Sequence, residues 1–160
     1  MILVSSCLLG QCTKYNGGHN LHPFFEKERQ HILPVCPETM GGLSAPRPPA
    51  EIIGGSGKDV IDGRAAIRLK TGEDVTGAFL EGAKRVLSLA QKHQARFAVL
   101  KESSPSCGAH TIYDGTFSGM KVPGEGAATA LLRAHGITVY SEKDITEELW
   151  QTMTEAEQEC

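Results

Sequence analysis

The sequence lacks the features that mark several large classes of protein. No apolar run approaches the ~20 residues that cross a bilayer, and no basic residue directly follows Met1, so neither a membrane helix nor a signal peptide is predicted. Aromatic residues make up 6% of the 160 residues, too few for a platform that stacks single-stranded nucleic acid. The formal net charge of −3 excludes a global basic footprint for nucleic acid or anionic membranes. We therefore expect a cytoplasmic protein with neither as a partner.

The five cysteines also lack the spacing of the commonest thiol sites. No Cys-x-x-Cys pair is present, which disfavours a zinc ribbon or a thioredoxin-type site. No Gly-x-Ser-x-Gly elbow is present, which disfavours a serine hydrolase. In a reducing cytoplasm, several cysteines favour metal binding or catalysis over disulfides. Cys160 ends a charged tail, and we expect it to take no part.

The pattern of apolar residues predicts an α/β fold. From residue 74 to 94, apolar side chains recur with the spacing of an amphipathic helix. Asp62-Gly63, between the β-prone runs 59–61 and 65–69, predicts a hairpin. The other strands are expected at 1–6, 32–35, 96–100 and 137–140, and the other helices at 22–30, 124–135 and 144–157. This alternation predicts one domain, residues 1–160, with a mostly parallel Rossmann-like sheet, helices on both faces and a small hairpin insertion.

Three of the cysteines come soon after predicted strands. Cys7, Cys36 and Cys107 follow the apolar runs 2–4, 32–35 and 97–100. Because ligands of such sheets bind beyond the carboxyl ends of the strands, we expect the three thiols to share one site. Three thiolates suit a soft metal or an iron–sulfur cluster. Cys12 lies only five residues after Cys7, so the ligand set stays open, as does the alternative that Cys7 and Cys36 are buried core residues.

Polar residues that could do chemistry lie beside these thiols. Glu38 is two residues after Cys36 and could act as a general acid or base, or it could be a solvated loop residue. Arg47, in a proline-rich loop, could contact a substrate carbonyl or an anion, or it could lie at the surface. Three serines precede or adjoin Cys107 and could orient a substrate, relay a proton or simply form the turn: Ser103, Ser104 and Ser106.

These motifs together resemble a small bacterial family, long catalogued as a domain of unknown function, that includes 2-thiouracil desulfidases. The residues that carry the resemblance form three blocks, 4–10 with 15–17, then 36–38 with 41–43 and 46–51, then 101–108. The resemblance implies a [4Fe-4S] cluster held by Cys7, Cys36 and Cys107. It also implies catalytic help from a glutamate and a serine, which we place on Glu38 and Ser104.

The resemblance implies a desulfidase that acts on thiolated pyrimidines such as 2-thiouracil. The thiocarbonyl would become a carbonyl, and sulfide would leave through the open iron of the cluster. Ser103, Ser106 and Arg47 are the expected substrate-binding residues, in a monomer or homodimer. The alternative is a module that binds or senses a metal or cluster without turnover. A sulfur carrier acting on tRNA is disfavoured by the acidic balance of the chain.

Overall fold

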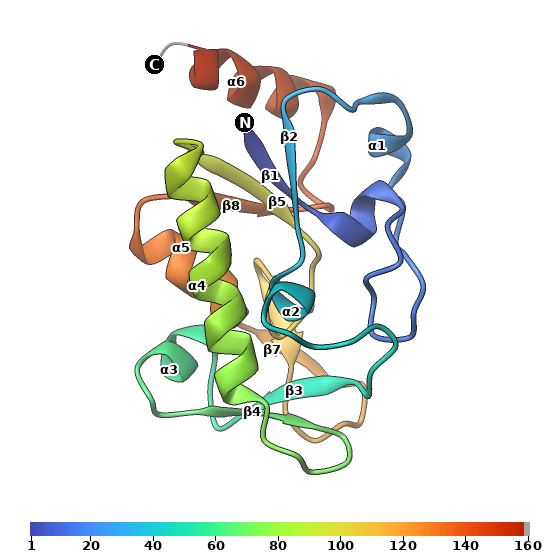
Figure 1. The fold of residues 1–160 in the computed structure, drawn as a ribbon, viewed down its shortest axis with the longest axis vertical. Coiled ribbons are helices and arrows are strands. Elements are labelled where there is room, and N and C mark those ends of the chain that lie inside the picture. Colours follow the sequence, from blue (N-terminus) through green and yellow to red (C-terminus); the bar gives the residue numbers. More distant parts are fainter. Residues whose placement is uncertain (159–160) are drawn as a thin grey trace.

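The computed structural model describes residues 1–158, so Cys160 lies outside the described residues. Figure 1 shows strands and helices alternating along this part of the chain. The strands are β1 (Ile2–Ser5), β2 (Ile32–Val35), β3 (Ala50–Ile53), β4 (Ala66–Leu69), β5 (Phe97–Leu100), β6 (Thr111–Tyr113), β7 (Lys121–Pro123) and β8 (Thr138–Ser141). The helices are the 3-10 turn η1 (Ser6–Leu9), α1 (Pro23–Lys27), α2 (Pro37–Met40), α3 (Gly57–Ile61), α4 (Thr76–Lys92), α5 (Ala127–Ala134) and α6 (Glu147–Gln158). None of these helices is long and apolar enough to cross a membrane.

The central sheet is fully parallel, with the strand order β2-β1-β5-β8. The chain moves outward from β1 to β2 and then returns to β5 on the other side of β1. The carboxyl ends of β1 and β5 therefore form the switch point at which such sheets bind ligands. Pro34 lies in β2, at the edge of the sheet, where a missing backbone donor does least harm.

Helices cover both faces of this sheet, and alternate residues of each strand face opposite sides. Leu3 packs into the core formed with α4 and α5. Ile2 and Val4 pack into the opposite core, which contains Phe25 of α1 and Trp150 of α6. The predicted α/β class, the mostly parallel sheet and the helices on both faces are confirmed.

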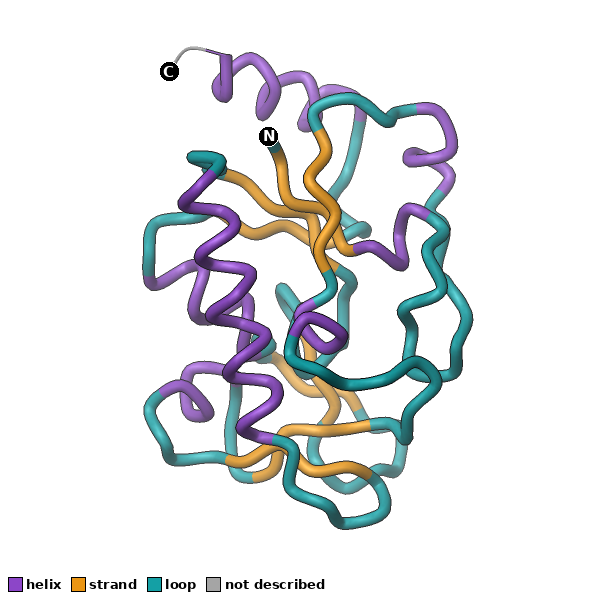
Figure 2. The backbone as a smooth tube through the Cα atoms, in the orientation of Figure 1, coloured by secondary structure: helices purple, strands orange, loops and turns teal. Residues whose placement is uncertain are grey.

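Two antiparallel pairs lie beyond the central sheet, β3 with β4 and β6 with β7 (Figure 2). The predicted hairpin has the wrong partners, because residues 57–61 form α3 and β4 pairs with β3. Ser56 and Asp59 form a capping box, in which Asp59 accepts a hydrogen bond from the Ser56 N–H. This local cap stabilises a helix where the Asp62-Gly63 signal had suggested a strand.

Two predicted helices begin or end elsewhere. The helix expected at 22–30 is confined to α1, whose start is capped by the His22 ring accepting from the Phe24 N–H. The final helix begins at Glu147 instead of after a cap at Asp144. The Thr146 hydroxyl caps it, because Asp144 is already bound to the Ser141 N–H.

A close backbone contact joins α2 to α4. A Cβ on Gly82 would lie 1.8 Å from the Pro37 carbonyl oxygen, and one on Gly41 would lie 2.1 Å from the Ala78 carbonyl oxygen. Only glycine permits this approach at either position. Since Cys36 is the N-cap residue of α2 and Glu38 lies in its first turn, this contact also sets their position.

We expect Gly82→Ala to destabilise the fold by about 1–3 kcal/mol, although alanine is the better helix former, because the new methyl group meets backbone. Urea unfolding followed by circular dichroism measures the change. Gly77→Ala is the matched control on the same helix, since no atom lies within 4 Å of the added Cβ. Gly77→Ala should stabilise the fold by up to about 1 kcal/mol. Equal effects of the two changes would show that the close contact of Gly82 with α2 does not limit its side chain.

Candidate active site

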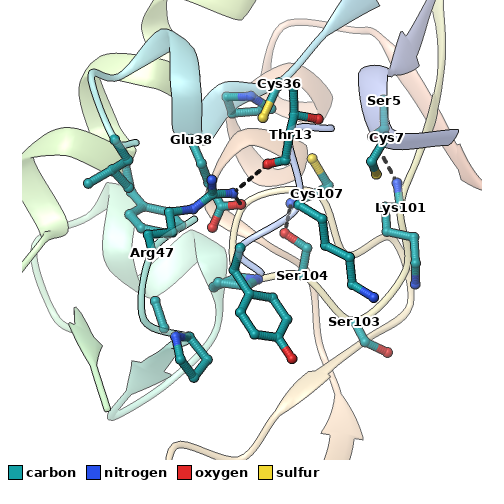
Figure 3. Close-up of a pocket in the computed structure, with 18 of the residues that line it drawn as sticks. Ser5, Cys7, Thr13, Cys36, Glu38, Arg47, Lys101, Ser103, Ser104 and Cys107 are labelled. Atoms are coloured by element: carbon teal, nitrogen blue, oxygen red, sulfur yellow. Dashed lines mark hydrogen bonds and ion pairs between the residues drawn. The ribbon is translucent and has the colours of Figure 1, made fainter. Parts of the chain in front are cut away.

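Three cysteines meet at one cavity of about 360 Å³ beyond the carboxyl ends of the parallel strands. Cys7 lies in η1 after β1, Cys36 caps α2 after β2, and Cys107 lies in the loop after β5. All three line the cavity, and Figure 3 shows their sulfur atoms directed toward it. The expected convergence of thiols from distant parts of the chain is thus found. Cys12 is exposed and is not among the lining residues.

Burial dominates the electrostatics of these thiols. It raises the pKa of Cys107 to about 12, against an opposing hydrogen bond from the Ser106 hydroxyl. Burial also raises the pKa of Cys7, against an opposing hydrogen bond from the Asn20 side chain. The neighbouring Cys36 raises the pKa of both, so the three groups lie close enough to repel as thiolates. Without a cation, the site favours neutral thiols.

The start of α5 holds the Cys107 loop in place. The backbone N–H groups of Gly126, Ala127 and Ala128 donate to carbonyl oxygens of residues 108, 105 and 106, at 2.8–2.9 Å. The Thr129 hydroxyl donates to the Cys107 carbonyl oxygen at 2.9 Å. A Cβ on Gly126 would lie 2.4 Å from the Ser106 carbonyl carbon, so glycine permits this packing.

Glu102 organises the same loop from inside. Its buried carboxylate accepts hydrogen bonds from the backbone N–H groups of Ala109, His110 and Thr111 at 2.9–3.0 Å, and from Ser103 at 3.3 Å. Burial alone would raise the pKa of Glu102, but these donors outweigh it and lower the pKa from 4.5 to about 2. The ionised carboxylate thus accepts the backbone hydrogen bonds of this turn, which a helix or strand would otherwise accept.

We expect Glu102→Gln to lower the free energy of unfolding at pH 7 by about 2 kcal/mol, because charge-assisted hydrogen bonds are lost. The folded pKa of Glu102 lies below the unfolded one, so its contribution is complete above pH 4.5 and is lost toward pH 2. The difference in the free energy of unfolding between wild type and variant should therefore become smaller as the pH falls through this range. Urea titrations at pH 7, 4.5 and 3 test this, with the exposed Glu155→Gln as control. A gap that does not change with pH would contradict it.

Glu38 and Arg47 form an ion pair at the cavity wall. Arg47 Nη2 donates to Glu38 Oε2 at 2.7 Å, and the two side chains are only 6% and 18% exposed respectively. The guanidinium also donates to the carbonyl oxygens of Thr13 and Ser44, each at 3.0 Å (Figure 3 shows the contact with Thr13). The Arg47 guanidinium thus holds Glu38 of α2 and ties its own proline-rich loop to the loop that contains Thr13.

The three serines near Cys107 differ in whether they line the cavity and in the partners of their hydroxyl groups. Ser104 lines the cavity, and its Oγ accepts from the backbone N–H groups of Ser106 and Cys107, both at 3.1 Å. Ser103 lines the cavity too, but its hydroxyl shares a hydrogen bond of 3.0 Å with Thr111. Ser106, also expected to bind substrate, is 1% exposed and is not among the residues that line the cavity. Its hydroxyl instead donates to Cys107 Sγ at 3.5 Å.

Sequence reasoning missed several polar residues of the cavity. Lys101 lines it, with Nζ 3.1 Å from the Glu102 carbonyl oxygen and 3.5 Å from Glu142 Oε1. Glu142 in turn accepts from the Glu102 N–H through both oxygens, at 2.9 and 3.1 Å. Thr13 and Asn20 also line the cavity. Apart from the adjacency of Lys101 to the serine block, nothing in the sequence marked them, because the contacts depend on the fold.

The donor set fits an iron–sulfur cluster better than a single metal ion. Within residues 1–158, no three His, Cys, Asp or Glu side chains are close enough together to hold one ion. Three cysteine thiols that line one cavity are the ligand type of an iron–sulfur cluster, which is larger than one ion. The positive iron would also remove the penalty that burial places on the thiolates.

Comparisons with known proteins agree with this arrangement. The model of the 2-thiouracil desulfurase family matches residues 2–144. Over 149 residues the chain is 48% identical to the uncharacterized protein YbbK of Bacillus subtilis (strain 168), covering 92% of this chain and 99% of the relative. A solved structure, the [4Fe-4S]-dependent thiouracil desulfidase TudS, is similar with a TM-score of 0.79 and 39% identity, over 99% of this chain and 98% of that one. The resemblance expected from the three sequence blocks is therefore confirmed, and the chain belongs to the 2-thiouracil desulfurase family.

Proposed function

We propose that this chain is a [4Fe-4S]-dependent desulfidase that converts the thiocarbonyl of thiolated pyrimidines, such as 2-thiouracil, to a carbonyl. The observation that carries the proposal is the convergence of Cys7, Cys36 and Cys107 on one cavity that also contains a half-buried carboxylate–guanidinium pair. Family membership and the similarity to TudS support it. Overall, a thiocarbonyl and water give a carbonyl and hydrogen sulfide, so no external oxidant or reductant is needed.

The three cysteines would hold the cluster. When bound through three protein thiolates, it supplies an iron without a protein ligand, a soft Lewis acid suited to a thiocarbonyl sulfur. The proline-rich loop forms part of the cavity wall through Arg47, Pro48 and Pro49. The remaining chemistry falls to the side chains of the chain itself.

Glu38 would take a proton from the attacking water. Arg47 holds Oε2, and no hydrogen bond among the described residues engages Oε1. One oxygen thus keeps the carboxylate oriented while the other is free to accept a proton. Arg47 would act as a positioning residue, because its three bonds to Glu38, Thr13 and Ser44 leave the guanidinium little freedom to bind substrate directly.

Ser104 would donate a hydrogen bond or a proton to the substrate. Two backbone N–H groups already point at its Oγ, and they stabilise negative charge on that oxygen as its proton moves away. Its hydroxyl also lies 2.9 Å from Ser106 Oγ, which donates to Cys107. Ser103 and Ser106 are then residues that build the turn.

We further propose a small-molecule substrate and not a nucleic acid, a cytoplasmic location, and a monomer or homodimer as the working form. In reaction class the enzyme is hydrolase- or lyase-like, since a C–S bond is cleaved and oxygen from water enters. The alternative is a module that binds or senses a metal or an iron–sulfur cluster without turnover, and that leaves thiocarbonyl compounds unchanged.

Anaerobic reconstitution with iron and sulfide, followed by incubation with 2-thiouracil, tests the proposal. We expect bound iron and sulfide in cluster stoichiometry, formation of uracil and release of sulfide. Cluster uptake without sulfide release from thiolated pyrimidines would favour the binding module. Failure to bind iron at all would overturn both readings.

A further inference from the structure

Thr13 carries a hydroxyl group without a partner. Within residues 1–158, its Oγ1 is the one buried side-chain nitrogen or oxygen that makes no hydrogen bond. Thr13 lines the same cavity as the three thiols, and Figure 3 shows it among them, beside Arg47. A buried hydroxyl without a partner is unfavourable, so such a group in a binding cavity calls for a partner from outside the chain.

Hydrogen bonds hold the backbone of Thr13, whereas none holds its hydroxyl. Its N–H donates to the Gln11 carbonyl oxygen at 2.9 Å, and its own carbonyl oxygen accepts from Arg47 at 3.0 Å. No hydrogen bond holds the hydroxyl in its rotamer. Because Thr13 lines the cavity, a change of its side-chain rotamer moves Oγ1 relative to the cavity without moving the backbone.

Two of the three cavity cysteines, Cys7 and Cys107, already have side-chain hydrogen-bond donors. Asn20 acts on Cys7, and Ser106 and Ser5 act on Cys107. Among the hydrogen bonds of the described residues, none comes from a side chain to Cys36 Sγ. Hydrogen bonds to the sulfurs of an iron–sulfur cluster help to set its reduction potential.

We propose that Thr13 Oγ1 donates a hydrogen bond to a sulfur of the cluster bound by Cys7, Cys36 and Cys107. This inference rests on the proposed function, because it needs the cluster in the cavity. The hydroxyl is a positioning and tuning group that completes the set of donors around the cluster. The donor stabilises the more negative, reduced form of the cluster and protects it against loss.

Thr13→Val separates this role from a structural one, because valine has the same shape and lacks the hydroxyl. We expect the cluster-free variant to be at least as stable as the wild type, since an unpartnered buried hydroxyl is removed. After anaerobic reconstitution, the variant should have a more negative reduction potential and a several-fold shorter cluster half-life than the wild type. Thr13→Ser should match the wild type in reduction potential and cluster half-life. Thr138→Val, at an exposed position of β8, should change neither quantity.

The outcomes distinguish this inference from the function on which it rests. If the wild type takes up no cluster, the proposed function fails. If the wild type loads normally and Thr13→Val matches it in potential and half-life, the role of Thr13 alone is wrong. A cluster-free Thr13→Val protein that is clearly less stable would indicate a structural role and overturn the inference. A normal cluster with a raised KM would assign the hydroxyl to the substrate, and would overturn it as well.

Discussion

Glu38→Gln should lower the rate of sulfide release by at least about 100-fold, because the amide cannot accept the proton that the attacking water gives up. Glutamine keeps the size of the side chain and can still accept a hydrogen bond from Arg47, so the loops stay joined. Bound iron and the visible absorption of the reconstituted cluster should match the wild type. The measurement is the single-turnover rate with 2-thiouracil, together with the iron content of the same samples.

The matched control is Glu81→Gln, which removes the carboxylate of an exposed ion pair with Arg85 on α4. That pair contributes about 0.3–0.5 kcal/mol to stability and lies outside the cavity, so turnover should be unchanged. Wild-type turnover by Glu38→Gln would remove Glu38 from the mechanism. Loss of iron from Glu38→Gln would show that the carboxylate supports the cluster and does not move a proton.

Replacing any one of the three cavity cysteines by serine should abolish the intact cluster and reduce turnover to background. A serine hydroxyl is a harder, more weakly acidic ligand than a thiol, so iron is held poorly at that corner. Cys7 and Cys36 are half-buried, and serine there should leave the fold intact by circular dichroism. Iron and sulfide should fall well below the ~4 of each expected for a complete cluster.

Cys12→Ser is the control for these variants, because Cys12 is exposed and does not line the cavity. We expect its iron content and turnover to equal those of the wild type. A cluster lost from Cys12→Ser and retained by Cys36→Ser would show that the ligand set is different. This experiment settles the ambiguity that the short spacing between Cys7 and Cys12 leaves in the sequence.

The convergence of the thiols could be predicted from the sequence because it follows from local patterns and one general rule. Apolar runs mark the strands before Cys7, Cys36 and Cys107, and parallel strands end at a common edge. The amphipathic pattern of α4 was equally clear, with apolar residues at helical spacing. The hairpin was misassigned because an Asp-Gly signal competed with a capping box at Ser56 and Asp59, and the helix formed.

The arrangement around the thiols could not be predicted, because it depends on contacts between distant residues. Glu102 reads as an ordinary charged residue until the turn wraps its N–H groups around the carboxylate. The choice among the serines depends on hydrogen-bond partners, since the Ser103 hydroxyl is bound to Thr111 while Ser104 Oγ accepts from the Ser106 and Cys107 N–H groups. The pairing of Arg47 with Glu38 depends on the course of a proline-rich loop that no periodicity describes.

The loops that carry the sulfur atoms are anchored by groups other than the sulfurs. The Cys7 carbonyl oxygen accepts from Asn20, the Cys36 carbonyl oxygen accepts from Met40, and the Cys107 carbonyl oxygen accepts from Thr129. We therefore expect a chain without its cluster to keep the shape of the cavity. Insertion of a cluster into such a chain should then require little reordering of the three loops.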